Sequence, residues 1–107
     1  MAYKTIQFTE LKENNPYGFM FIDLYNNTFI FTIRWNSYCN CAFLSISDYD
    51  DNPIISNVAL VNNLRIRNKN LPYILVFSQI NGESYEPTID NISNEFALIY
   101  NDEVIVS

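Results

Sequence analysis

Carboxylates are the most numerous groups in this sequence that general acid–base catalysis uses. The candidates are Asp23, Asp90 and the acidic residues within 48–51. Most of them lie in segments with the composition of turns, where Asp and Asn side chains satisfy nearby backbone groups. The chain contains no His, so it cannot build a Ser-His or Cys-His pair, and Gly18 and Gly82 stand alone instead of forming a phosphate loop. We therefore expect no enzymatic activity and no cofactor.

One acidic stretch has part of the spacing of a calcium-binding loop. Asp48, Asp50 and Asn52 occupy positions one, three and five of such a loop. Pro53 stands where the sharp turn needs Gly, and Ala59 stands where the loop needs a bidentate Glu. We expect a solvated hairpin loop here and no metal site.

The two cysteines, Cys39 and Cys41, are separated by one residue. In an extended strand this spacing puts both side chains on one face, about 6.6 Å apart, which is outside good disulfide geometry. The prediction is therefore two reduced thiols in a protein made in a cytosol. A metal site is not expected from them, because the sequence has no His and no third Cys to complete it.

Half of the six basic residues lie in one short segment, as Arg65, Arg67 and Lys69. At a period of two they share one face of an extended segment, with Leu64 and Ile66 on the other. One interpretation is a charged edge strand that discourages aggregation. Another is a docking face for an acidic neighbouring subunit. A third interpretation, nucleic-acid binding, has less support, because three cations in a chain of net charge −6 make a small electrostatic footprint.

Aromatic residues make up 16% of the chain, and half of them are Tyr. On a small β-barrel such residues can stack on single-stranded bases, whereas Tyr is also enriched in protein–protein interfaces. We assign four aromatics to the core: Phe29, Phe31, Trp35 and Phe43. The interface candidates are drawn from Tyr3, Tyr17, Tyr38, Tyr49 and Tyr85.

Apolar residues alternate with a period of two along most of the chain, and this pattern predicts strands. Residues 25–28 separate two such runs and favour a tight hairpin with a primed turn. The expected strands are 19–24, 29–36, 42–46 and 54–61, forming a four-strand meander, then 73–80 and a final hairpin of 96–100 with 104–106. No window shows a helical stripe. The predicted fold is all-β: a small antiparallel β-sandwich or partly open β-barrel of about seven or eight strands.

Length and composition exclude several classes of protein. A chain of 107 residues predicts a single domain, residues 1–107. Its 49% of hydrophobic residues is too high for disorder, and its net charge of −6 argues against a polyanion as the main partner. No apolar run approaches the roughly 20 residues that span a bilayer, and the N-terminus has no apolar segment typical of a secretion signal. We expect neither a membrane partner nor export.

The order of these pieces resembles the small baseplate plug proteins of contractile-tailed phages, a family of the cyanophage type. The most particular parts are the strand end Arg34-Trp35-Asn36 and the loop Pro87-Thr88-Ile89-Asp90-Asn91-Ile92. The resemblance runs from about Phe8 to Tyr100. Two positions depart from the family pattern: Phe43 replaces a usual Trp, and Ser93 replaces a usual Gly.

The resemblance implies a non-enzymatic virion protein in or beside the baseplate hub, close to the central channel. Its partners would be hub, spike or tube subunits, in several copies set by the symmetry of the assembly, and it would be assembled in the host cytoplasm. The candidate interface residues are Arg65, Arg67, Lys69, Tyr38, Tyr49 and Tyr85. Two alternatives are a single-stranded nucleic-acid-binding β-barrel and an acidic inhibitor of a host enzyme.

Overall fold

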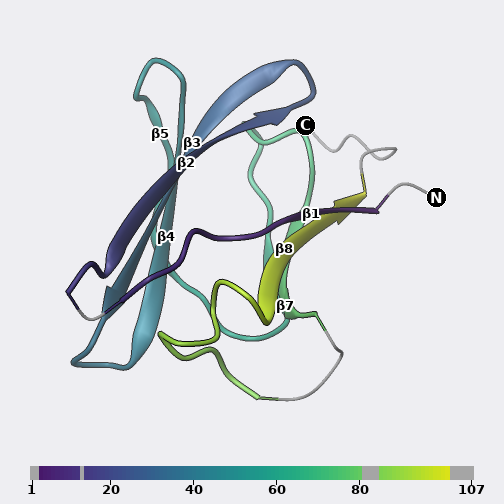
Figure 1. Ribbon diagram of the computed structural model, residues 1–107. Coiled ribbons are helices and arrows are strands. Elements are labelled where there is room, and N and C mark those ends of the chain that lie inside the picture. The colour runs from purple at the N-terminus through teal and green to yellow at the C-terminus, as the bar shows by residue number, and fades with distance from the viewer. Residues whose placement is uncertain (1–2, 13, 81–84, 102–107) are drawn as a thin grey trace.

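Alternating apolar residues produce two layers of antiparallel strands in the computed structural model, which describes residues 3–12, 14–80 and 85–101 (Figure 1). One sheet is a meander in chain order: β2 (Tyr17–Leu24), β3 (Asn27–Asn36), β4 (Cys41–Asp48) and β5 (Pro53–Ala59). The predicted four-strand meander is confirmed. Each strand pairs with the next in sequence because every connection is a short reversal.

Asn and Asp provide most of the left-handed backbone conformations in the described chain. Leu24 pairs with Asn27, so the β2–β3 loop is two residues long, and both residues have positive φ: Tyr25 at 49° and Asn26 at 68°. This confirms the predicted primed turn, whose two central residues require positive φ. The other described non-glycine residues with positive φ are all Asn or Asp: Asn40, Asp51, Asn57 and Asn63. Asn thus replaces Gly at turns because it tolerates the left-handed region.

The second sheet joins the two ends of the described chain. Its order is β1 (Tyr3–Ile6), β8 (Phe96–Asn101), β7 (Leu75–Gln79) and β6 (Leu64–Ile66). Tyr3 lies opposite Asn101, so the first strand pairs with the last (Figure 1). The strand expected at 96–100 is confirmed, whereas its predicted hairpin partner at 104–106 lies outside the described residues.

The two sheets enclose one hydrophobic core. On β3 the inward positions are Phe29, Phe31, Ile33 and Trp35, all buried as the alternation predicts. In the other sheet, the ring of Phe77 on β7 stacks on that of Phe96 on the neighbouring β8, at 5.2 Å between centroids. No described strand pairs across the two sheets. The fold is therefore an all-β sandwich, the first of the two predicted architectures, and not a barrel.

Phe43 was expected in the core, and this prediction is wrong. Ala42 takes the inward position on β4, where it lies opposite Trp35 in the register of the sheet. A small residue there leaves room for the indole ring. Phe43 consequently points to the outer face, where the guanidinium carbon of Arg34 lies 5.4 Å from its ring centroid.

Candidate partner-binding surfaces

The basic segment, defined as Arg65, Arg67 and Lys69, lies at one edge of the sandwich. All three side chains are exposed, while Ile66 between them is buried. β6 is an edge strand, because it pairs with β7 alone among the described strands. Over residues 3–12, 14–80 and 85–101 the one ion pair joins Lys12 to Glu10, so none of the three cations has a carboxylate partner within this part of the chain.

The extended segment is shorter than the sequence predicted. Only Arg65 lies within a strand, since β6 ends at Ile66. Asn68 then fixes a turn: its side-chain oxygen accepts the N–H of Asn70 at 2.9 Å, and its amide donates to the carbonyl of Ile54 at 3.2 Å. This second bond attaches the basic segment to β5 of the opposite sheet. The three cations are therefore all exposed, although they do not share one strand face.

A second surface follows the outer face of β2. Tyr17 and Tyr49 were interface candidates from the sequence, but Phe19 and Phe21 between them were missed. The aromatic row, defined as Tyr17, Phe19 and Phe21, occupies alternate outward positions on this strand. Phe19 and Phe21 are 55% and 58% exposed, and their rings meet edge to face at 5.8 Å. Tyr49 extends the row from the β4–β5 loop, with its ring 6.4 Å from that of Phe21.

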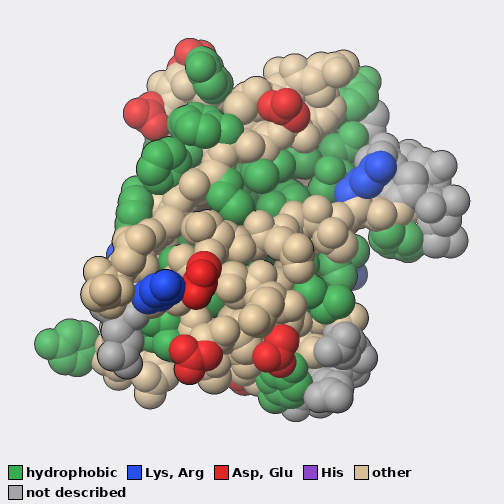
Figure 2. All heavy atoms as spheres, viewed as in Figure 1, with side chains coloured by type: hydrophobic (Ala, Val, Ile, Leu, Met, Phe, Trp, Pro, Cys, Tyr) green, Lys and Arg blue, Asp and Glu red, His purple; other side chains and the backbone are tan. Residues whose placement is uncertain are grey.

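Figure 2 shows the hydrophobic side chains that run along the outer side of this sheet, at the left of the view, with carboxylates near the upper end. The sequence contains a pattern that could have indicated this exposed apolar surface. Residues 19–22 are apolar on both faces of the strand, and a two-layer sandwich buries only one face of each strand.

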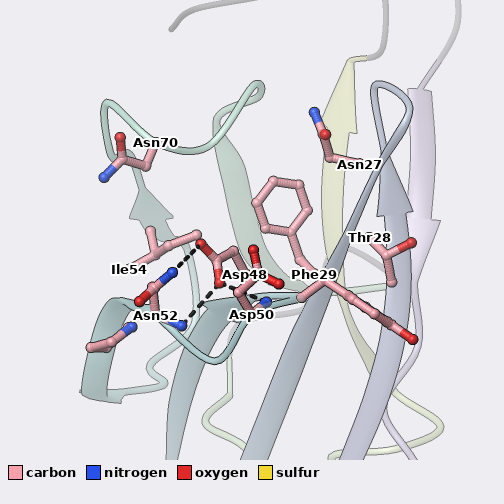
Figure 3. A pocket seen from close by; sticks show the side chains of 10 residues that line it. Asn27, Thr28, Phe29, Asp48, Asp50, Asn52, Ile54 and Asn70 are labelled. Atoms are coloured by element: carbon pink, nitrogen blue, oxygen red, sulfur yellow. Dashed lines mark hydrogen bonds between the residues drawn. The ribbon is translucent and has the colours of Figure 1, made fainter.

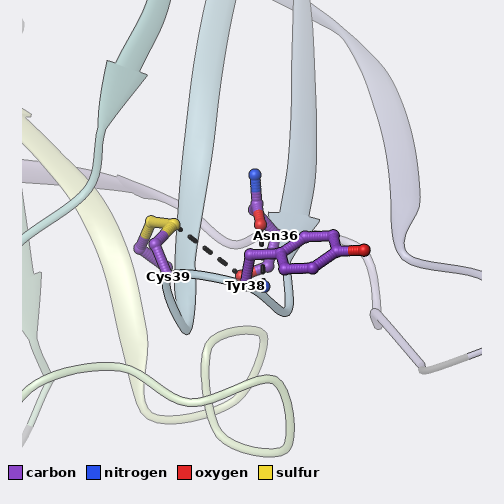
Figure 4. The surroundings of a disulfide bond; sticks show 4 residues. Asn36, Tyr38 and Cys39 are labelled. Carbon is purple, nitrogen blue, oxygen red and sulfur yellow. Dashed lines mark hydrogen bonds between the residues drawn. A yellow bond between two sulfur atoms is a disulfide. The ribbon is translucent and has the colours of Figure 1, made fainter.

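Tyr38 projects from the tip of the β3–β4 hairpin. It is fully exposed, and its backbone N–H donates to the side-chain oxygen of Asn36 at 2.9 Å (Figure 4). The ring is therefore held on an anchored turn. This position suits a contact with a neighbouring protein, because an exposed Tyr on a fixed turn offers contact area at low entropic cost.

The same hairpin corrects the prediction for the cysteines. Cys39 and Cys41 form a disulfide, and the structure describes no free thiol in its resolved ranges (Figure 4). The prediction assumed an extended strand, but Cys39 lies in the turn and Asn40 has a φ of 51°. This reversal places the two Cα atoms 5.4 Å apart, within the range that a disulfide spans.

Tyr85 does not lie on an exposed surface with the other candidates. It is half-buried, and its ring packs edge to face on that of Phe96 at 5.7 Å. Its hydroxyl accepts a hydrogen bond from the Nε2 of Gln79 at 2.9 Å and donates to the carboxylate of Glu95. Gln79 is the buried polar side chain of β7, so this network satisfies it. Tyr85 thus has an internal role in this structure.

In the loop with calcium-like spacing, the carboxylate of Asp48 accepts hydrogen bonds from other residues of the same loop. One oxygen of Asp48 accepts the backbone N–H groups of Asp50 and Asn52, each at 2.9 Å, and the other accepts the side-chain amide of Asn52 at 3.1 Å (Figure 3). The bonds from Asn52, backbone first and then side chain, lower the pKa of Asp48. No cluster of three or more potential metal ligands occurs in the described ranges. Asp48 is a turn-forming residue.

A family model described as the cyanophage baseplate Pam3 plug gp18 matches residues 3–103. The chain belongs to this family of baseplate plugs. Comparison with curated proteins found no match, and comparison with solved structures found none either. Family membership confirms the resemblance and makes this plug a structural component of a phage baseplate.

The matched range of the plug includes both surfaces described above, the aromatic row and the basic segment. A baseplate protein works through contacts with its neighbours, and exposed aromatic rings and exposed cations are side chains that can make such contacts. In the described part of the plug, no helix is long and apolar enough to span a membrane.

Proposed function

We propose that this plug is a structural subunit of the virion that binds hub, spike or tube subunits near the central channel of the tail. Membership of the plug family over residues 3–103 is the observation that carries the proposal. Several copies, set by the symmetry of the baseplate, would be assembled in the host cytoplasm.

The surface chemistry supports this role. Tyr38 and Tyr49 are large exposed side chains on hairpin turns, and such residues contribute contact area at protein interfaces. The basic segment offers three cations in a chain of net charge −6, which fits an acidic patch on a neighbouring subunit better than it fits a nucleic acid.

Deletion of the plug gene from the phage tests this role. We expect particles with an incomplete baseplate and loss of infectivity, both restored by the wild-type gene. Mass spectrometry of purified tails and immunogold labelling should detect the plug at the distal end. A particle that lacks the plug but builds a normal baseplate and infects its host would contradict the proposal.

Complementation with variants then tests the surface. Arg65→Glu with Arg67→Glu reverses two charges of the basic segment, and Lys4→Glu with Lys12→Glu makes the same change of net charge elsewhere. We expect the first pair to reduce incorporation into tails and the second pair to leave it near the wild-type level. Equal incorporation of both variants would contradict a docking role for the basic segment.

A further inference from the structure

β2 is the strand of this sandwich that is least protected against pairing with another chain. It is eight residues long and lies at one end of its sheet, next to β3 only. Natural proteins protect such edges with Lys, Pro, bulges or very short strands. β2 contains no Lys, Arg or Pro, and its pairing with β3 runs without a register shift from Tyr17 to Leu24.

The other three edges carry these protections. β1 has four residues and includes Lys4. β5 begins at Pro53, contains Asn57 at positive φ, and shifts register twice against β4. β6 has three residues and includes Arg65. The absence of protection is therefore specific to β2.

The backbone of β2 adds hydrogen-bonding groups to this exposed side. Leu24 and Asn27 flank a two-residue turn, so they form a hydrogen-bonded pair, and such pairs recur at every second residue. At the opposite end the N–H of Trp35 donates to the carbonyl of Pro16 at 2.8 Å, in the same alternation. The residues between, namely the aromatic row and Asp23, consequently direct their N–H and C=O groups toward the outer edge.

One end of the aromatic row is acidic, whereas the basic segment is positively charged. Asp23 follows the aromatic row on the same face of β2, and Asp50 and Asp51 are exposed in the loop that carries Tyr49. Figure 2 shows carboxylates at this upper end of the sheet. The aromatic row therefore ends in negative charge, whereas the basic segment is positive and has no carboxylate partner in the described chain.

Arg65 and the aromatic row lie on opposite sides of one molecule. The aromatic row lies on the outer face of the meander, whereas Arg65 lies on the outer face of the other sheet, where it lines a cavity with Tyr3 and Val76. The turn at Asn70 approaches the acidic end of the row, because it lines a cavity with Tyr49 and Asp50. Arg65 faces away from the row of its own chain, so it can meet the row of a second copy. Such a contact is head-to-tail, and head-to-tail contacts build rings or filaments.

We infer that the plug associates with itself, with the basic segment of one copy docked on the aromatic row of the next. Arginine guanidinium groups stack on aromatic rings, and the outer face of this sheet already contains such a contact between Arg34 and Phe43. Asp23 would pair with the remaining charge at the end of the row. The inference rests on the proposed docking role of the basic segment, and it names a second copy as the partner.

Sedimentation velocity of the purified plug over a range of concentrations tests the inference. We expect a concentration-dependent increase in mass that weakens as salt screens the charges. Phe19→Ser with Phe21→Ser blocks the row, and Arg65→Glu with Arg67→Glu blocks the basic segment. Each blocked variant should raise the dissociation constant at least about tenfold. Circular dichroism and the fluorescence of Trp35 check that both variants fold.

Mixing the two blocked variants gives the decisive result. Each keeps one intact surface, so an equimolar mixture should form a heterodimer that does not grow further. Val61→Ser with Ile80→Ser removes two exposed apolar side chains elsewhere, and Lys4→Glu with Lys12→Glu is the charge control; both should associate like the wild type.

Three results would overturn the inference. One is a wild-type chain that stays monomeric at every concentration. Another is a basic-segment variant that still dimerises alone, which would indicate β2 pairing with β2. The third is a mixture that forms no heterodimer. All three leave the virion experiment above unaffected, so failure of self-association and failure of the baseplate role are distinguishable.

Discussion

Substitution of Gly18 by Ala tests how closely the N-terminal segment packs on β2. A Cβ atom at Gly18 would lie 2.2 Å from the Cγ2 of Thr9, whereas ordinary contacts begin near 3.4 Å. The distances to Leu11 and Ile33 would be an ordinary 3.7 Å each. The conflict is therefore confined to one methyl group. It is on a β-branched side chain, which is stiff at χ1 and does not swing aside freely.

The expected destabilisation follows from two opposing effects. Overpacking of this kind costs about 1–3 kcal/mol. Loss of glycine's freedom in the unfolded chain returns about 0.4–1 kcal/mol. Gly18→Ala should therefore lower the free energy of unfolding by about 1–2 kcal/mol, at about 4–8 °C in Tm for each kcal/mol. Urea and thermal unfolding can be followed by the fluorescence of Trp35, the single and buried tryptophan of the chain.

A second substitution separates the steric conflict from other causes. Thr9→Ser removes the Cγ2 methyl group and keeps the hydroxyl, so it should cost little alone and restore most of the stability of Gly18→Ala. The double-mutant cycle should give a favourable coupling of about 1 kcal/mol. If Gly18→Ala proves neutral, or if Thr9→Ser does not rescue it, the reasoning from this contact is refuted.

Three further predictions concern the reversals of the meander. Tyr25→Asn should raise stability by about 0.5–1 kcal/mol, because Asn tolerates the φ of 49° at this position better than Tyr does. Asp48→Asn should be less stable than the wild type at neutral pH, and the difference should disappear in acid. The pKa of Asp48 is lower in the folded than in the unfolded chain, so its ionised carboxylate stabilises the fold above the unfolded pKa. This contribution is lost as the pH falls through the folded pKa. Cys39→Ser with Cys41→Ser should cost no more than about 1.5 kcal/mol, because the disulfide closes a very short loop.

Unfolding measurements with matched controls decide these three cases. Tyr38→Asn, at an exposed turn position without positive φ, should change stability by less than about 0.5 kcal/mol. Asp50→Asn alters an exposed carboxylate of the same loop and should keep the acid dependence of the wild type. A neutral Tyr25→Asn, an unchanged pH profile for Asp48→Asn, or a larger loss on removing the disulfide would each contradict the corresponding argument.

Local chemistry made the meander predictable from sequence. The hairpin at Tyr25 and Asn26 follows from turn composition between two alternating runs, and the inward face of β3 follows from a period of two. The pairing of β1 with β8 had no such signal, because it joins residues almost a whole chain apart. Strand order at that distance depends on the packing of both sheets.

The errors also have physical causes. Phe43 was placed in the core by size, but the alternation along β4 buries Ala42, Leu44 and Ile46, so Phe43 lies on the outer face. The cysteines were read as part of a strand, and the positive φ of Asn40 brings them together instead. Phe19 and Phe21 are exposed because no second layer covers the outer face of β2. Sequence pattern alone did not reveal which of the two apolar faces of residues 19–22 the sandwich buries.

The pairing of β1 with β8 has a consequence for synthesis. The meander from β2 to β5 uses contacts between neighbours in sequence, which form quickly and at low entropic cost. The other sheet cannot form until β8, its last strand in chain order among the described residues, has been made. We expect the meander to acquire protection first in pulse-labelled hydrogen exchange, with β1 protected only together with β8. A plug leaving the ribosome would then expose the inner face of its meander until β8 has emerged, and a chain cut short before β8 would stay in that state.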